Sequence, residues 1–373
     1  MERVGPFIAV PGPFPADNLR HSRLVAGGLA RLTRGDRYLT SGPPVRDESD
    51  PVSSNDLRPP AIIVAGPTAS GKSALALAIA QRIGGTIVNA DSMQVYRELR
   101  VLTARPSPTD EALVPHRLYG VRPIEQAGNA AWWREAALET MAAVRLAGRV
   151  PVLTGGTGMY FAALTQGLAD VPDPGIEART EARRLLGELG PEALHAGLAK
   201  VDPATAARIA PNDSQRIARA WEVWRGTGMG LAAWQNRKLP PAPWRFFAVR
   251  LDPPREALRQ AIATRFAAML KAGAIEEVRA LLALNLDPAL PGMRAHGVPE
   301  LSAYLRGTLS LEEARRRTEL VTGQYTKRQT TWFRHHDLAR PEASEIIASR
   351  FAEDTQFSER ILERILAFIQ SRD

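Results

Sequence analysis

The sequence contains no cysteine among its 373 residues. It therefore forms no disulfide, has no cysteine-based zinc site and offers no cysteine nucleophile. Its six histidines are scattered, at spacings that do not match a metal site. No apolar run approaches the roughly 20 residues that cross a bilayer, and the N-terminus shows no signal-peptide pattern. These absences lead us to expect a cytoplasmic protein with no membrane segment.

Charge is unbalanced, with 48 lysines and arginines against 40 acids and a formal net charge of +8. Cationic side chains favour polyanionic partners, because neutralising phosphates releases their condensed counterions. Many basic proteins nevertheless bind no nucleic acid, so charge alone does not decide the matter. The 45% hydrophobic content is enough to bury a sizeable core in one large or two modest domains.

Residues 1–58 are rich in proline, glycine, arginine and serine and show no helical or strand periodicity. We expect a largely disordered extension, with one short helix over 24–32. Ordered structure is predicted to begin at Ala61.

Alternating strand and helix signals follow. The run 61–65 (AIIVA) is typical of a buried parallel strand, and helical spacing covers 73–83. Further strands are predicted at 86–89 (TIVN), 150–153 (VPVL) and 244–251 (WRFFAVRL). The pattern predicts an α/β protein with a parallel sheet.

Between residues 166 and 240 the apolar spacing is helical throughout, and no strand is evident. We therefore predict a P-loop NTPase-like core over 59–165 and 241–340, interrupted by a helical insertion over 166–240. The remainder, 341–373, is expected to be a helical C-terminal tail.

The segment GPTASGKS at 66–73 matches the full phosphate-binding pattern G-x-x-x-x-G-K-[ST], directly after a strand and before a helix. The glycines allow backbone amides to curl around phosphate oxygens, the lysine adds charge, and the serine hydroxyl is a ligand for Mg²⁺. The pattern does not identify the phosphate compound, so ATP is one possible occupant. The predicted loop comprises Gly66, Pro67, Thr68, Ala69, Ser70, Gly71, Lys72 and Ser73, with Ser73 as the metal ligand.

Asp91 follows the second apolar strand and has three readings. An acid in that place positions magnesium in P-loop NTPases. An acid at the carboxyl edge of the sheet is also placed to act as a general base on a nucleophile that attacks a bound donor. The third reading is a helix N-cap, a position that Asp favours.

Six motifs occur in a fixed order: GPTASGKS, NADSMQVYR (89–97), PHRLYGV (115–121), GGTGMYFAAL (155–164), PNDSQRIARAWEV (211–223) and QYTKRQTTWFR (324–334). Together they resemble the bacterial tRNA dimethylallyltransferase (tRNA isopentenyltransferase) family over residues 60–336. The chain departs from that family at Gly323, where a basic residue is usual.

The resemblance implies dimethylallyl diphosphate as donor and, as acceptor, N6 of the adenosine immediately 3′ of the anticodon in tRNAs that read codons beginning with U. It implies that the P-loop holds a leaving diphosphate, with Mg²⁺ as cofactor. We expect a monomer.

Site residues carried over from the family fall into two groups, those with a role in the chemistry and those that contact tRNA. Asp91 matches the general base, Thr157 a contact to both the tRNA and the diphosphate, and Arg265 an arginine that reaches the diphosphate. Further tRNA contacts match Asp91, Ser92, Met93, Gln94, Thr157, Arg179, Gln215, Arg216, Ile217, Ala218 and Arg219.

Several of these residues also have a purely structural interpretation. Arginines at helical spacing over 215–219 are typical of a solvated helix face. The glycines at 155–157 also suit a turn that closes a strand, and the tryptophans suit packing better than base stacking. Two other functions remain open from the residues: a small-molecule P-loop kinase, and a nucleotide-driven RNA-binding switch without group transfer.

Overall fold

The computed structural model describes residues 57–351 and 359–371. The helix expected over 24–32 and nearly all of the expected extension 1–58 lie outside these residues. Across the described ranges, no helix combines the length and apolarity that crossing a bilayer requires.

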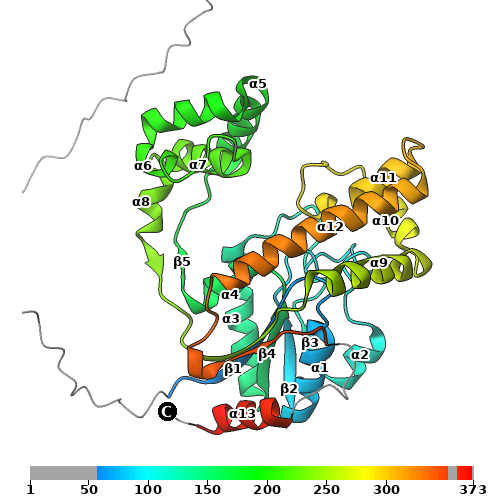
Figure 1. Ribbon diagram of the computed structural model, residues 1–373. Coiled ribbons are helices and arrows are strands. Elements are labelled where there is room, and N and C mark those ends of the chain that lie inside the picture. Colours follow the sequence, from blue (N-terminus) through cyan, green and yellow to red (C-terminus); the bar gives the residue numbers. More distant parts are fainter. Residues whose placement is uncertain (1–56, 352–358, 372–373) are drawn as a thin grey trace, which may run out of the picture. The chain divides into compact units, whose positions relative to one another are not determined.

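The core is a six-stranded sheet in the order β3-β2-β4-β1-β7-β8, and every neighbouring pair is parallel (Figure 1). The parallel α/β architecture predicted from the sequence is thereby confirmed. β1 is central, so the loop that follows it opens at the middle of the sheet's carboxyl edge. The strands are β1 (Pro60–Ala65), β2 (Gly85–Asn89), β3 (His116–Arg117), β4 (Val150–Gly155), β7 (Arg245–Leu251) and β8 (Ser344–Ile347).

Helices cover both faces of this sheet. One face carries α1 (Lys72–Ile83) and α13 (Glu359–Gln370). The other carries α3 (Ala130–Leu146), α4 (Gly158–Thr165), α9 (Arg255–Lys271), α10 (Ala274–Ala283), α11 (Val298–Leu305) and α12 (Leu311–Arg334). The remaining short elements of this part are α2 (Pro108–Leu113) and the 3₁₀ turns Gly292–Arg294 and Pro341–Ala343.

The apolar run that forms β1 serves both faces at once. Ile62 and Val64 pack with α1 and α13, whereas Ala61, Ile63 and Ala65 pack with the helices of the other face. Successive side chains of a strand point to opposite faces, so a central strand covered on both sides has to be apolar at every position.

The insertion consists of α5 (Gly175–Val201), α6 (Pro203–Ala206), α7 (Ser214–Thr227) and α8 (Leu231–Gln235) around a small core of its own. α5 is broken at Gly190, which has a φ of 79° and precedes Pro191. The expectation that this region holds no strand is wrong. β5 (Leu168–Ala169) and β6 (Lys238–Leu239) pair antiparallel where the chain enters and leaves the insertion, and two residues are too few to show alternation.

The expectation of a purely helical C-terminal tail needs a correction as well. Residues 344–347 form β8, which pairs with β7 at the edge of the sheet, and the helix α13 follows at Glu359–Gln370. Four residues are too few for an alternating pattern to predict a strand, and the partner strand lies nearly 100 residues upstream.

After β8 the chain crosses the P-loop. Nε of Arg350 donates to the carbonyl of Ala69 at 2.8 Å, and the amide of Phe351 donates to the carbonyl of Ser70 at 3.0 Å. Gly71 has a φ of 90°, and a Cβ at this position would lie 1.7 Å from the Phe351 carbonyl oxygen. Glycine is therefore required at Gly71 both by its conformation and by this close backbone approach.

We predict that Gly71→Ala destabilises the fold more than Gly84→Ala does. Both glycines have positive φ, but a Cβ at Gly84 meets nothing within 4 Å. Gly84→Ala should therefore cost only the left-handed conformation, about 1 kcal/mol, whereas Gly71→Ala also has to displace Phe351. Thermal unfolding of the two variants checks this, and equal losses of stability would contradict the described contact.

Candidate active site

The P-loop joins β1 to α1 at the centre of the sheet, as the sequence predicts. Ala69 and Gly71 both have positive φ, and the loop closes on itself through a hydrogen bond from the Ser70 amide to the Pro67 carbonyl at 3.2 Å. The first amides of α1 then point into the loop without intrahelical acceptors. A loop of this form at a helix N-terminus is a site for an anionic oxygen cluster.

Lys72 places its ammonium group in the loop. The side chain is buried, and Nζ lies 3.4 Å from the Pro67 carbonyl oxygen. Burial lowers the pKa of Lys72 to about 8, although Asp91 opposes this shift and Arg265 adds to it. An anion bound in the loop would restore what burial removes, because it supplies the counter-charge that water no longer provides.

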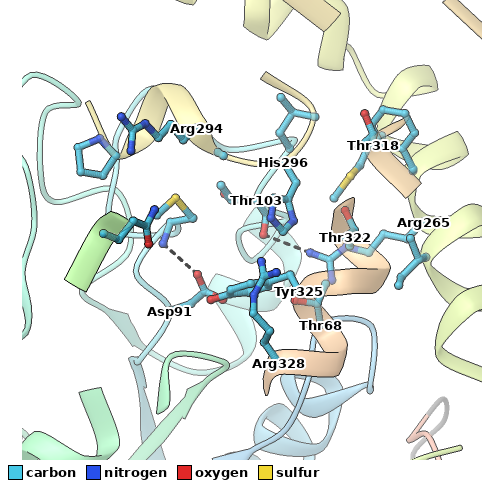
Figure 2. A pocket seen from close by; sticks show the side chains of 18 of the residues that line it. Thr68, Asp91, Thr103, Arg265, Arg294, His296, Thr318, Thr322, Tyr325 and Arg328 are labelled. Atoms are coloured by element: carbon cyan, nitrogen blue, oxygen red, sulfur yellow. Dashed lines mark hydrogen bonds between the residues drawn. The ribbon is translucent and has the colours of Figure 1, made fainter. Parts of the chain in front are cut away.

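Beside the loop lies a cavity of about 490 Å³ (Figure 2). Thr68 of the P-loop, Asp91 and Arg265 all line it, so it brings together groups that the sequence analysis assigned to one site. Its charged and polar lining also includes Arg294, His296, Thr318, Thr322, Tyr325 and Arg328. Its apolar lining includes Met93, Leu102, Ile262, Phe266 and Met269.

Asp91 is held by its own loop. Its amide donates to Asn89 Oδ1 at 2.9 Å, and its Oδ1 accepts from the Met93 amide at 2.9 Å. Asn89 is fully buried and also donates through Nδ2 to the Asp91 carbonyl. Residues 92–100 form turns and no helix, so the reading of Asp91 as a helix N-cap is wrong. The carboxylate instead caps a turn and faces the cavity.

Thr157 supports this loop from the turn after β4. Its hydroxyl accepts from the Ser92 amide at 2.9 Å and donates to Ser92 Oγ at 3.2 Å. Thr157 is absent from the cavity lining that includes Asp91. The structure therefore shows Thr157 as a support for the residue next to Asp91.

Arg265 reaches the cavity from α9. Its Nη2 donates to the Thr103 carbonyl at 3.2 Å, the hydrogen bond drawn in Figure 2. The same carbonyl accepts from Gln94 Nε2 at 2.8 Å. Burial lowers the pKa of Arg265 and the charge of Asp91 opposes the shift. A guanidinium held in this way is a fixed positive charge close to the acid.

Glu277 on α10 fixes the turn that supplies this carbonyl. Its carboxylate accepts from three successive amides, those of Arg100, Val101 and Leu102, at 2.7, 2.7 and 2.9 Å. The sequence analysis missed Glu277. Nothing local distinguishes it from the neighbouring exposed Glu276, because its partners lie more than 170 residues away in the chain.

Gln329 on α12 joins two loops and was likewise missed as a single residue, although its motif was noted. Its Oε1 accepts from the Thr68 amide at 2.8 Å and from the Thr68 hydroxyl at 3.1 Å. Its Nε2 donates to the Gly156 carbonyl at 2.8 Å. The amide group is therefore a buried bridge between the P-loop and the turn after β4.

One helical turn earlier, Tyr325 faces the same cavity. Its ring meets that of His296 edge to face, and Arg328 lies over it at 5.5 Å (Figure 2). Burial raises the pKa of Tyr325 to about 12, with Asp91 adding to the shift. For His296, burial and Arg328 lower the pKa while Asp91 opposes them. Both groups are thus neutral near pH 7.

The residues expected to contact tRNA fall into two sets. Met93 and Gln215 line the cavity. Gln94 does not: its side chain is buried and donates to the Thr103 and Ala104 carbonyls. The side chain of Ile217 is buried in the core of the insertion and is likewise not available to a ligand.

The arginines of the insertion lie at its surface in ion pairs. Arg179 pairs with Asp173 at 2.6 Å, Arg216 with Asp213 at 3.4 Å and Arg219 with Glu222 at 3.3 Å. Ala218, between the last two, is half-buried. Exposed pairs of this kind contribute little to stability, so the arginines can exchange these partners for another anion.

Among the described residues, no group of three or more histidines and acids could hold a metal ion. Ser73 is exposed at the start of α1, next to the P-loop. This donor set fits a magnesium ion held mostly by phosphate oxygens and water, since Mg²⁺ keeps several waters and needs few protein ligands.

Comparisons with known proteins agree with this geometry. Residues 94–336 match the family model described as IPP transferase. The chain is 61% identical over 312 residues to the tRNA dimethylallyltransferase of Granulibacter bethesdensis, which covers 83% of this chain and 98% of that protein. It is also 61% identical to the enzyme of the same name from Gluconacetobacter diazotrophicus, over 84% of this chain and 95% of that protein.

Solved structures show the same likeness. The full-length tRNA isopentenylpyrophosphate transferase of Bacillus halodurans superposes with a TM-score of 0.60 and 28% identity, over 84% of this chain and 98% of that one. A eukaryotic dimethylallyltransferase acting on tRNA gives a TM-score of 0.63 and 25% identity, over 74% of this chain and 69% of that one.

We predict that Glu277→Gln loosens the turn at residues 100–102 and weakens anion binding. Glutamine has one acceptor oxygen where three amides require acceptors, so Thr103 no longer holds Arg265 firmly. Hydrogen exchange at the three amides should accelerate, and affinity for inorganic pyrophosphate should fall by about 10-fold. Glu276→Gln is the matched control because Glu276 is exposed and forms an ion pair with the exposed Arg279 at 3.7 Å. Identical behaviour of the two variants would refute the assignment.

Anion binding should also depend on the charge of Lys72. The protonated form is the one that attracts phosphate, and it is lost as the pH rises through its pKa of about 8. Affinity for pyrophosphate should therefore be constant below pH 8 and fall by about 10-fold per pH unit above it, relative to Lys72→Ala. Titration calorimetry of both proteins from pH 6.5 to 9.5 measures this. Parallel profiles would remove Lys72 from the anion site.

Proposed function

The chain belongs to the IPP transferase family, and we propose that it transfers a dimethylallyl group from dimethylallyl diphosphate to N6 of the adenosine 3′ of the anticodon, in tRNAs that read codons beginning with U. The observation that carries the proposal is the cavity in which Asp91, Arg265 and the P-loop residue Thr68 meet. It combines a proton acceptor and fixed cations with an apolar wall.

The reaction follows from these groups. The lone pair of N6 attacks C1 of the dimethylallyl group, the C1–O bond breaks, and the diphosphate leaves with its electron pair. The proton on N6 passes to the carboxylate of Asp91. An adenine amine is a weak nucleophile, so a carboxylate within hydrogen-bond reach is needed as positive charge develops on the nitrogen.

Departure of the diphosphate requires positive charge at the other end of the bond. Lys72 and Arg265 both interact electrostatically with the Asp91 region, so we assign them to the leaving oxygens. Ser73 would be the protein ligand of a magnesium ion, which would add charge neutralisation at the leaving oxygens. Ser70 Oγ is buried, has no hydrogen-bond partner among the residues that the structure describes, and is a further donor inside the loop.

The apolar wall suits the prenyl group. Leu102, Ile262 and Phe266 exclude water from the carbon that is attacked, which limits hydrolysis of the donor. The cavity volume of about 490 Å³ exceeds what a five-carbon group needs. The extra space suits an adenine base that has left the anticodon stack, as enzymes that act on bases require.

We assign the surface arginines of the insertion, Arg179, Arg216 and Arg219, to the tRNA backbone. The net charge of +8 supports this assignment.

A P-loop kinase is the competing function, and one assay separates the two. The protein is incubated with unmodified tRNA and either labelled dimethylallyl diphosphate or γ-labelled ATP. Label should enter tRNA only from the prenyl donor, and mass spectrometry of the digested tRNA should place it on N6 of one adenosine. Phosphate transfer from ATP to any acceptor, without prenylation, would overturn the proposal.

We predict that Asp91→Asn lowers kcat by roughly 10²- to 10⁴-fold while leaving tRNA affinity nearly unchanged. Asparagine still accepts the Met93 amide, so the free energy of unfolding should change by less than about 1 kcal/mol. If Asp91 mainly positions magnesium, a higher magnesium concentration should restore much of the rate. Near-normal turnover in Asp91→Asn would exclude the residue from the mechanism.

A further inference from the structure

Gln329 closes the cavity-facing side of the P-loop. Its carboxamide is only 5% exposed and makes three hydrogen bonds, two with Thr68 and one with Gly156. Thr68 also lines the reaction cavity, so it marks the point where the loop meets that cavity. An anion that extends from the loop toward the cavity has to pass this point.

The carboxamide can sit in only one orientation. The Thr68 amide needs an acceptor and the Gly156 carbonyl needs a donor, so oxygen faces the P-loop and nitrogen faces the turn. In a flipped amide, Nε2 would face the Thr68 amide, donor against donor, and Oε1 would face the Gly156 carbonyl, acceptor against acceptor. Gln329 therefore presents a carbonyl oxygen, which repels phosphate, on the side where a phosphate-binding loop normally presents donors.

This bond divides the donors of the loop. The Thr68 amide is committed to Gln329, and the Ser70 amide is committed to the Pro67 carbonyl. The donors left for a ligand are the first amides of α1, which have no intrahelical acceptors, and the Lys72 ammonium, whose Nζ lies 3.4 Å from the Pro67 carbonyl oxygen. That set can surround one phosphoryl group and reach a second.

A nucleoside triphosphate needs more hydrogen-bond donors from the loop than a diphosphate does. In P-loops that bind it, the backbone cradles the inner phosphates while the lysine reaches the outer ones, so the ligand draws on the whole loop. A third phosphoryl group that continues from Lys72 toward Thr68 would have to displace Gln329 from the Thr68 amide. It would then leave the Gly156 carbonyl without its donor or place phosphate oxygens against Oε1.

We propose that Gln329 makes this P-loop selective for a diphosphate over a triphosphate by occupying the Thr68 amide and hydroxyl. The inference rests on the proposed function in that the prenyl donor carries the diphosphate. It names the residue that excludes ATP from a loop whose sequence alone would accept it. Gly156 belongs to the same device, because a Cβ there would lie 2.2 Å from Gln329 Nε2.

The test is direct binding of inorganic pyrophosphate and inorganic tripolyphosphate, measured by calorimetry at equal free magnesium. The wild-type protein should bind pyrophosphate at least about 10-fold more tightly. Gln329→Ala frees Thr68 and opens space, so tripolyphosphate should bind more tightly than it does to wild type, and the preference should shrink or reverse. Gln324→Ala is the matched control, with the same residue type at an exposed position of α12.

Gly156→Ala offers a second route to the same outcome, because it displaces the Gln329 side chain without removing it. A merely structural role would weaken both anions together, whereas the proposal requires a gain in tripolyphosphate binding. An unchanged preference in both variants, or equal loss of both anions, would overturn it. The prenyl-transfer assay on the wild-type protein is independent, so failure of that assay would count against the proposed function alone.

Discussion

The electrostatics of the site depend on one buried ammonium group, that of Lys72. Burial in the P-loop removes the hydration of the Lys72 ammonium group. Its pKa falls to about 8 because the surrounding protein groups stabilise the charged form less than water does. Asp91 is the acid that opposes this shift, and Arg265 increases the local surplus of positive charge. With two cations and one carboxylate close together, the site is short of negative charge. That shortage favours a ligand with several anionic oxygens.

The helix α12 connects this local arrangement to the rest of the fold. It packs against α4, α9 and α11 and is the long orange helix in Figure 1. Along one of its faces, Tyr325 touches Thr157 and His296, and Gln329 holds the P-loop to the turn after β4. One rigid helix thus fixes the distance between the anion loop, the acid's supporting turn and the cavity wall. Precision of this kind is what positioning catalysis requires.

The parts of the site that the sequence could predict are those with local patterns. The P-loop needs only its eight residues, and Asp91 is announced by the apolar strand before it. The family resemblance added Arg265, which has no local signature on α9. Glu277 and Gln329 were missed because the local sequence does not show what a glutamate or glutamine on a helix contacts. Their partners lie up to 177 and 261 residues away in the chain. Matching a motif also does not say whether a side chain faces a ligand or the core, and the side chains of Gln94 and Ile217 are both buried. The strands β5, β6 and β8 are too short for alternation to show.

The crossing of the P-loop by Arg350 and Phe351 bears on how the protein is made. The loop leaves the ribosome early, but the segment that braces Ala69 and Ser70 follows 281 residues later. At the usual pace of synthesis in the cell, that interval is roughly 15 to 55 s. During this interval the P-loop lacks the hydrogen bonds from Arg350 and Phe351. A chain cut short before Arg350 never gains that brace. The backbone around Ala69 and Ser70 is therefore fully braced only after residues 350–351 have been synthesised.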